Sequence, residues 1–118
     1  MKYVFPSKLR LKNKQQFKKI FHDAKRLTGN YFTVFLKANA LNHPRLAIII
    51  TKRSVRNAVD RNRLRRIIKE SFRLHQYVVS GYDVLIIASK DINQLTNKEL
   101  TQCLAKQWQR LHTHQEKA

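Results

Sequence analysis

The chain has 118 residues, with 25 Lys or Arg against 7 Asp or Glu, so its formal net charge is +18. A hydrophobic fraction of 42% excludes a disordered chain, and only two Gly, two Pro and one Cys exclude a collagen or a disulfide-stapled module. The length predicts one domain over 1–118, with a basic N-terminal segment at 1–12 and a frayed tail at 112–118. A lone thiol, and the lack of a signal-peptide pattern or an apolar run long enough to span a membrane, favour the cytoplasm.

The cations gather in two stretches. Residues 1–26 hold nine Lys or Arg against one acid, and residues 52–73 hold nine against two. Such a charge requires a polyanionic partner or a strong nonspecific affinity for one, and nucleic acid is the abundant polyanion inside a cell.

The first predicted element is a helix that begins at Asn13, with Gln16 three positions on as in a capping box. Apolar residues then recur at helical spacing until Gly29 and Asn30 stop the run. No strand is predicted before residue 31.

Two strands follow, at Tyr31–Ala38 and Arg45–Thr51, and the Asn and Pro residues between them predict that they form a hairpin. Alternation along the first strand places Tyr31, Thr33 and Phe35 on one face and Phe32, Val34 and Leu36 on the other; if the first face is exposed, the second faces the helices as core.

A long helix is predicted at Asn57–Gln76, where Asn57 and Asp60 mark the start, and Ser80-Gly81 breaks the chain after it. A mostly apolar strand is predicted at Tyr82–Ser89. Thr96 and Glu99 form a capping box that opens the last helix. The order αββαβα predicts an α+β fold with a small sheet covered on one face by helices.

The helix at 57–76 carries the most informative side chains. Its apolar stripe includes Leu64, Ile67, Ile68, Phe72 and His75, and five polar or basic side chains gather on the opposite side. We call these five the basic rail: Asn62, Arg65, Arg66, Lys69 and Arg73.

Arginine suits phosphate because its planar guanidinium donates two parallel hydrogen bonds. Upstream, Lys52, Arg53 and Arg56 lie in the loop before the positive end of the helix dipole. A solvated helix face usually mixes both signs of charge, and no rail position is acidic, so contact with RNA or DNA is predicted. Arg61 lies near the edge of the apolar stripe, where a cation must either extend past the core or reach a specific partner.

The run KRSVRNAVDRNRLRR at 52–66, continued by IIKESFR to residue 73, resembles the Arg-Asn-Arg signature of the protein component of bacterial ribonuclease P. The resemblance covers about residues 5 to 111. One departure is the Gly-free step Ser54–Asn57, where many members have a shorter step with Gly.

The resemblance implies a four-stranded mixed sheet packed against three main helices, with a left-handed βαβ crossover (ribosomal protein S5 domain 2-like), against the general right-handed rule. The additional strand would be a split of Tyr31–Ala38 or a short piece near the N-terminus.

The resemblance also implies a division of labour. The RNA subunit, with Mg²⁺, hydrolyses the phosphodiester that joins the 5′ leader to precursor tRNA, and the protein, with no cofactor of its own, assists folding, affinity and substrate discrimination. The protein's expected partners are this RNA and the leader, with no membrane and no DNA. The residues expected to bind the RNA subunit are Lys52, Arg53, Arg56, Arg61, Asn62, Arg63, Arg65, Arg66, Lys69 and Arg73. Those expected to bind the single-stranded leader are Phe17, Lys18, Phe21, Tyr31 and Phe35.

Other interpretations of single residues remain open at this point. The rings of the second set could belong to the core, although exposed rings beside cations are also what single-stranded RNA stacks on. Cys103 lies on an apolar helix stripe and is predicted to be a buried structural thiol, and His112 and His114 are weak metal candidates. The seven acids are dispersed singly, which argues against paired catalytic carboxylates.

Three alternative classes fit less well. A ribosomal-protein-like binder shares the charge but has no reason to carry the Arg-Asn-Arg helix with the Phe17 and Phe21 pair. A DNA-binding regulator needs a short second helix after a tight turn. A membrane-active amphipathic peptide would need the apolar faces that the core uses.

Overall fold

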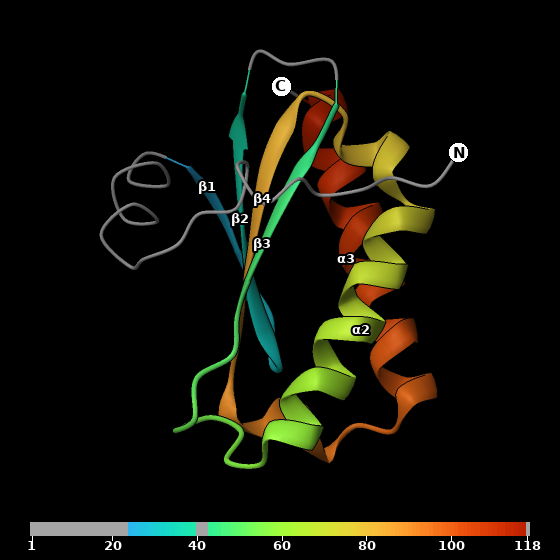
Figure 1. The fold of residues 1–118 in the computed structure, drawn as a ribbon. Helices are drawn as coiled ribbons and strands as arrows, with labels where there is room; N and C mark the ends of the chain where they lie inside the picture. Colours follow the sequence, from blue (N-terminus) through green and yellow to red (C-terminus); the bar gives the residue numbers. More distant parts are fainter. Residues whose placement is uncertain (1–23, 40–42, 118) are drawn as a thin grey trace.

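The computed structural model describes residues 24–39 and 43–117. Strands β1 (Lys25–Thr28), β2 (Phe32–Ala38), β3 (Arg45–Ile49) and β4 (Tyr82–Ala88) form one sheet, and helices α2 (Ala58–Leu74) and α3 (Asn97–Lys117) cover one face of it (Figure 1). Two short 3-10 helices in the described part, η2 (Gln76–Val79) and η3 (Lys90–Gln94), flank β4. Residues 13–23 of the predicted first helix lie outside the described residues.

The strand order is β1-β2-β4-β3, so the predicted hairpin between the second and third strands is wrong. Strand β4 lies between them, antiparallel to β2 and parallel to β3, and α2 forms the crossover from β3 to β4. The physical reason is the composition of β4, whose residues 83–86 are all buried. A strand that is apolar on both faces belongs inside a sheet, and the turn residues after β2 suit a longer connection equally well.

The fourth strand of the sheet is β1, at the place where the predicted first helix was expected to end. It pairs antiparallel with β2 from Lys25 opposite Leu36 to Thr28 opposite Thr33, so the helical prediction is wrong for residues 25–28. Gly29 lies in the turn of this hairpin. A side chain does not fit there, because a Cβ would lie 2.9 Å from the Phe32 carbonyl oxygen. The additional strand was expected either from a split of 31–38 or from a short piece near the N-terminus. Because β2 is continuous, the split did not occur, and β1 agrees better with the second expectation.

The core lies between the sheet and the two helices. Phe32, Val34 and Leu36 are buried there, as their alternation predicts. Leu64 and Ile68 of α2 are fully buried, and the apolar residues of α3 complete the layer: Leu100, Leu104, Trp108 and Leu111. Cys103 packs against the edge of this cluster, on the apolar side of α3 as predicted, but it is half-buried and not buried.

Side chains cap the N-termini of both helices. Asn57 Oδ1 accepts from Val59 N at 3.0 Å and caps α2, as predicted. Thr96 and Glu99 form the predicted capping box of α3, with reciprocal hydrogen bonds of 2.9 and 3.1 Å. Helix α3 continues to Lys117, through the segment predicted to be frayed.

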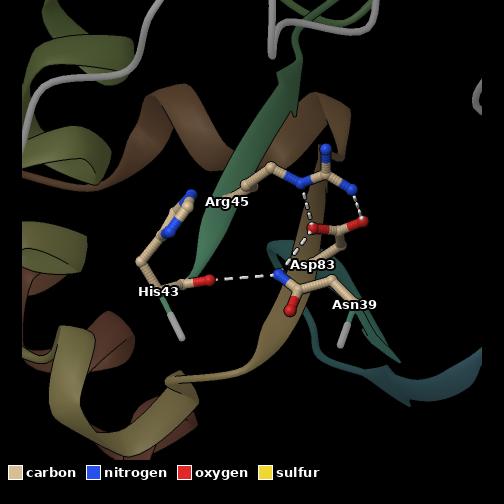
Figure 2. Close-up of polar contacts among 4 residues, drawn as sticks. All are labelled: Asn39, His43, Arg45 and Asp83. Carbon is tan, nitrogen blue, oxygen red and sulfur yellow. Dashed lines mark hydrogen bonds and ion pairs between the residues drawn. The ribbon is translucent and has the colours of Figure 1, made fainter. Parts of the chain in front are cut away.

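A buried carboxylate holds the start of the parallel strand pair (Figure 2). Asp83 of β4 is 5% exposed, and both its oxygens accept hydrogen bonds of 2.6 Å from the guanidinium of Arg45 on β3. Asn39 Nδ2 donates to the same carboxylate at 3.0 Å and to the His43 carbonyl oxygen at 3.1 Å. The cluster joins the end of β2, the beginning of β3 and the beginning of β4, on which the α2 crossover is built.

Candidate RNA-binding surface

Helix α2 is fixed in rotation by its contact with α3. The ring of Phe72 packs edge-on against Trp108 at 6.1 Å between centroids, and the buried indole Nε1 donates to Ser71 Oγ at 2.8 Å. Since this side of α2 faces the core, the basic rail faces away from it. The helix therefore presents its polar side outward on a rigid support.

The middle of the basic rail holds the cations that are available to a ligand. Arg66 and Lys69 are exposed and Arg65 is half-buried. Within the described part of the chain, none of these three side chains makes a hydrogen bond or an ion pair. Asn62 is exposed beside them. Unpaired cations on one helix face form a row of phosphate-binding groups.

The end of the basic rail is less basic than predicted. Arg73 donates from Nε to Glu70 at 3.1 Å and makes a second contact through Nη2, so an acid lies against the last rail position. The hydrogen bond from Arg73 is the largest cause that lowers the pKa of Glu70, and the same bond raises the pKa of Arg73. Both groups are exposed, so this pair contributes little to stability.

Two arginines of the signature use their donors within the chain. Arg61 Nη1 donates to the carbonyl oxygens of Val55 and Arg56, at 2.8 Å each. Arg63 donates to the side-chain oxygen of Asn97 at the start of α3 and, at 3.1 Å, to that of Asn93 in η3. Arg61 is half-buried, and these hydrogen bonds mean that both arginines support the surrounding structure.

The loop before α2 places the other predicted cations. Val55 is 2% exposed and anchors the Gly-free step in the core. A turn at Thr51 precedes it, with Ser54 N donating to Thr51 Oγ1 at 3.1 Å. Lys52, Arg53 and Arg56 are exposed on either side of this anchor.

A second candidate surface lies on the face of the sheet opposite the helices. Phe35 alternates with buried Val34 and Leu36, so its ring points to that face and is half-buried. The guanidinium carbon of Arg26 on β1 lies 5.9 Å from the centre of this ring. Tyr31 is half-buried and packs against the core cluster. Phe17, Lys18 and Phe21 lie outside the described residues.

Sequence reasoning missed two residues on these surfaces. Arg26 was assigned to a helix, and only the pairing of β1 with β2 places it against Phe35. Tyr77 in η2 was not singled out, yet it is 73% exposed at the end of α2. Its signal in the sequence is weak, because a single aromatic residue after a helix is equally consistent with core packing.

Among residues 24–39 and 43–117, no group of three or more His, Cys, Asp or Glu side chains is placed to hold a metal ion. The side chains of His112 and His114 are outside what the structure describes. In the same part of the chain, neither helix is long and apolar enough to span a bilayer. Helix α2 follows a strand and a loop, not the short first helix that a helix-turn-helix regulator requires.

The family model described as Ribonuclease P matches residues 5–112. This chain belongs to the ribonuclease P protein family. It is a protein subunit of bacterial ribonuclease P, a tRNA-processing endoribonuclease. The ribonuclease P protein component of Vibrio cholerae serotype O1 is 41% identical over 109 residues, which is 92% of each chain. That of Azotobacter vinelandii is 42% identical over 108 residues, covering 91% of this chain and 83% of the relative.

Solved ribonuclease P proteins have the same fold. The chain is similar to the RNase P protein from Thermotoga maritima, in complex with 1-(4-fluorophenyl)-2-thiourea, with a TM-score of 0.75, 28% identity and coverage of 86% of this chain and 98% of that one. The RNase P protein of Staphylococcus aureus gives a TM-score of 0.74 at 28% identity, over 82% and 89% of the two chains. The predicted α+β fold with a four-stranded mixed sheet is thereby confirmed, with α2 and α3 as its helices in the described part.

Proposed function

We propose that the basic rail and the loop before it bind the RNA subunit of ribonuclease P. The observation that carries this proposal is the set of three cations, Arg65, Arg66 and Lys69, that lie on one face of α2 without a protein partner in the described part of the chain. A folded protein gains nothing from such a row of like charges, which repel one another, unless a polyanion binds it. Successive phosphates along one RNA strand would neutralise these charges and release counterions.

The other residues predicted to bind the RNA subunit fall into two groups, those that are exposed and those that already bond within the chain. Exposed Lys52, Arg53, Arg56 and Asn62 extend the same surface and are proposed to contact RNA directly. Arg61 and Arg63 are proposed to act mainly as supports, because their donors are used inside the chain. Arg73 contributes least, since Glu70 offsets its charge.

We infer that the 5′ leader of precursor tRNA binds on the opposite face of the sheet. Phe35 with Arg26 over its ring combines a stacking surface with a phosphate-binding group, which suits single-stranded RNA. Phe17, Lys18 and Phe21 belong to this proposal from the sequence alone. Tyr31 supports the site from the core side, since it packs against the buried cluster.

The protein is proposed to assist, while the RNA subunit with its Mg²⁺ performs the hydrolysis in the cytoplasm. Four of the acids in the described part already have structural partners: Asp60 accepts from Asn93, Glu70 from Arg73, Asp83 from Arg45 and Glu99 from Thr96. Carboxylates that already accept hydrogen bonds from neighbouring side chains or backbone are poorly placed to act as general acids or bases.

Reconstitution tests the proposal. The purified chain is mixed with a bacterial ribonuclease P RNA at a magnesium concentration where the RNA alone is nearly inactive, and cleavage of a precursor tRNA is followed. We expect cleavage to depend on the protein, and to be reduced by the pair Arg66→Ala and Lys69→Ala. The matched control is Lys106→Ala, an exposed cation on α3 away from the rail. Cleavage that is the same with and without folded wild-type protein would contradict the proposal.

A further inference from the structure

Three aromatic side chains form a column from the core to the surface at the end of α2. The innermost ring is Trp108, which is 1% exposed, and the ring of His75 lies 6.4 Å from it at an interplanar angle of 23°. The ring of Tyr77 lies 6.4 Å from His75 at 29°. We call these three residues the aromatic column.

The two inner rings of the aromatic column are held by hydrogen bonds to one residue. Trp108 Nε1 donates to Ser71 Oγ at 2.8 Å, and His75 Nδ1 lies 2.8 Å from the Ser71 carbonyl oxygen. Tyr77 is held differently, through its neighbours in η2, because Val78 and Val79 are buried at 7% and 0% exposure. With both following residues fixed in the core, the chain directs Tyr77 outward.

The outer ring is therefore an exposed surface that stacks on the His75 ring and projects from a backbone held by two buried neighbours. Tyr77 is 73% exposed, and its neighbour Leu74 is 57% exposed. A ring that is immobilised before binding loses little rotamer entropy when a ligand stacks on it. This is the property that distinguishes a binding platform from a tyrosine on a flexible loop.

The surroundings of Tyr77 indicate its ligand. Tyr77 follows the last turn of α2, and Gln76 Nε2 donates to the Arg73 carbonyl oxygen at 3.0 Å, which ties η2 to the end of the basic rail. Arg73 itself is paired with Glu70, so the cations that would hold the phosphates next to a stacked base are Lys69 and Arg66, earlier on the same face of α2. Unpaired nucleobases stack on rings that lie near such cations. A protein interface needs a much larger apolar area than Leu74 and Tyr77 offer.

We propose that Tyr77 is a stacking platform for an unpaired base of the ribonuclease P RNA, at the end of the basic rail. This inference rests on the proposed function of the rail. The RNA subunit is favoured over the leader because Tyr77 lies in η2, directly after α2. The helices cover one face of the sheet (Figure 1), whereas alternation along β2 turns Phe35, with Arg26 over its ring, to the other face.

The test compares Tyr77→Leu with Tyr77→Phe. Leucine keeps apolar bulk without a ring face, and phenylalanine keeps the ring. We expect Tyr77→Leu to weaken binding of the chain to ribonuclease P RNA by about five- to a hundred-fold, and Tyr77→Phe to bind within about twofold of wild type. A further control is Gln102→Ala, which removes an exposed side chain from α3, outside the basic rail and the loop before it, and should leave affinity unchanged.

A salt series separates stacking from charge. Stacking releases no counterions, so the dependence of log Kd on log salt should have the wild-type slope in Tyr77→Leu. Wild-type affinity in Tyr77→Leu would overturn the Tyr77 inference while leaving the proposed function intact, whereas failure of the wild-type chain to bind the RNA would overturn the proposed function itself.

Two further outcomes would also overturn the inference. If the weaker binding appeared only with leader-bearing precursor tRNA added to preassembled holoenzyme, the base would belong to the substrate. If Tyr77→Leu instead abolished a concentration-dependent dimer seen by sedimentation of the wild-type chain, the occupant would be a second copy.

Discussion

The guanidinium of Arg61 closes the loop that leads into its own helix, because its Nη1 donates to the carbonyl oxygen of Val55 at 2.8 Å. Val55 is buried, and the same nitrogen reaches the next carbonyl, of Arg56. A residue expected from the sequence to contact RNA thus has a role in the folded chain before any ligand arrives.

Replacing Arg61 should therefore affect stability. We expect Arg61→Met, which keeps the stem and removes the donors, to lower the free energy of unfolding by about 1 to 3 kcal/mol, since it removes hydrogen bonds donated by a charged group. Urea denaturation of the free protein measures this. An unchanged unfolding midpoint, together with weaker binding to RNA, would instead assign Arg61 to direct contact.

Arg66 should behave in the opposite way. It is exposed and makes no hydrogen bond or ion pair within the described residues, so we expect Arg66→Ala to leave the melting temperature nearly unchanged. Binding to the RNA subunit should weaken, and the log-log slope against salt should fall by about 0.7 to 0.9, because the variant neutralises one phosphate fewer. The same titration with Lys106→Ala provides the baseline. A lower melting temperature at an unchanged slope would show that Arg66 is structural.

Phe35 tests the leader surface. We expect Phe35→Leu to weaken binding of precursor tRNA with a leader of several nucleotides by about five- to a hundred-fold, because one base can no longer stack. Mature tRNA should bind as before, since it places no single-stranded bases on this face, and affinity for the RNA subunit should not change. Equal weakening toward every ligand, with a lower melting temperature, would favour a packing role.

The carboxylate of Asp83 should be important to the fold alone. Asp83→Asn removes the negative charge that faces the Arg45 guanidinium, whose side chain is 27% exposed and partly solvated. We expect the free energy of unfolding to fall by about 1 to 3 kcal/mol. The double variant with Arg45→Met should be destabilised by less than the sum of the two single changes. Additive effects would mean that the pair is not coupled.

Acid should weaken the cap of α3. A backbone hydrogen bond from Thr96 is the main cause that lowers the pKa of Glu99 from its ordinary value of 4.5. A carboxyl whose pKa falls on folding stabilises the protein above its unfolded pKa, and this stabilisation is lost as the pH falls through the folded pKa. Glu99→Gln should thus melt below wild type at neutral pH, and the difference should shrink as the pH falls below the ordinary pKa of the carboxyl group. A difference that is constant with pH would contradict this.

How much of this could be predicted depended on the local strength of each pattern. The apolar period of α2, the cap at Asn57 and the capping box of Thr96 and Glu99 each bring together neighbours in sequence, and each was predicted. The residues of β1 were assigned to a helix because an edge strand with a single buried residue, Leu27, carries almost no pattern. Only the family resemblance predicted an additional strand. The pairing of β2 with β4 was missed because it joins residues about fifty positions apart, which no local spacing reports.

The same contrast applies to the surface. The shared face of the basic rail follows from helical geometry, since the helix alone sets the directions of its side chains. The internal donors of Arg61 and Arg63 depend on where the preceding loop and η3 lie, which only the tertiary structure determines. The motif therefore predicted a candidate surface without distinguishing the arginines that bond within the chain from the exposed ones.

Because β4 lies in the middle of the sheet, the sheet cannot form until late in the synthesis of the chain. Until synthesis passes Ala88, β2 and β3 have no strand between them, and the β1–β2 hairpin alone is marginally stable. A nascent chain at that stage exposes unpaired strand edges and the apolar stripe of α2 together with most of its cations. Premature termination should thus give an insoluble fragment, because the helix that carries the basic rail has no core to pack on before the last third of the chain is complete.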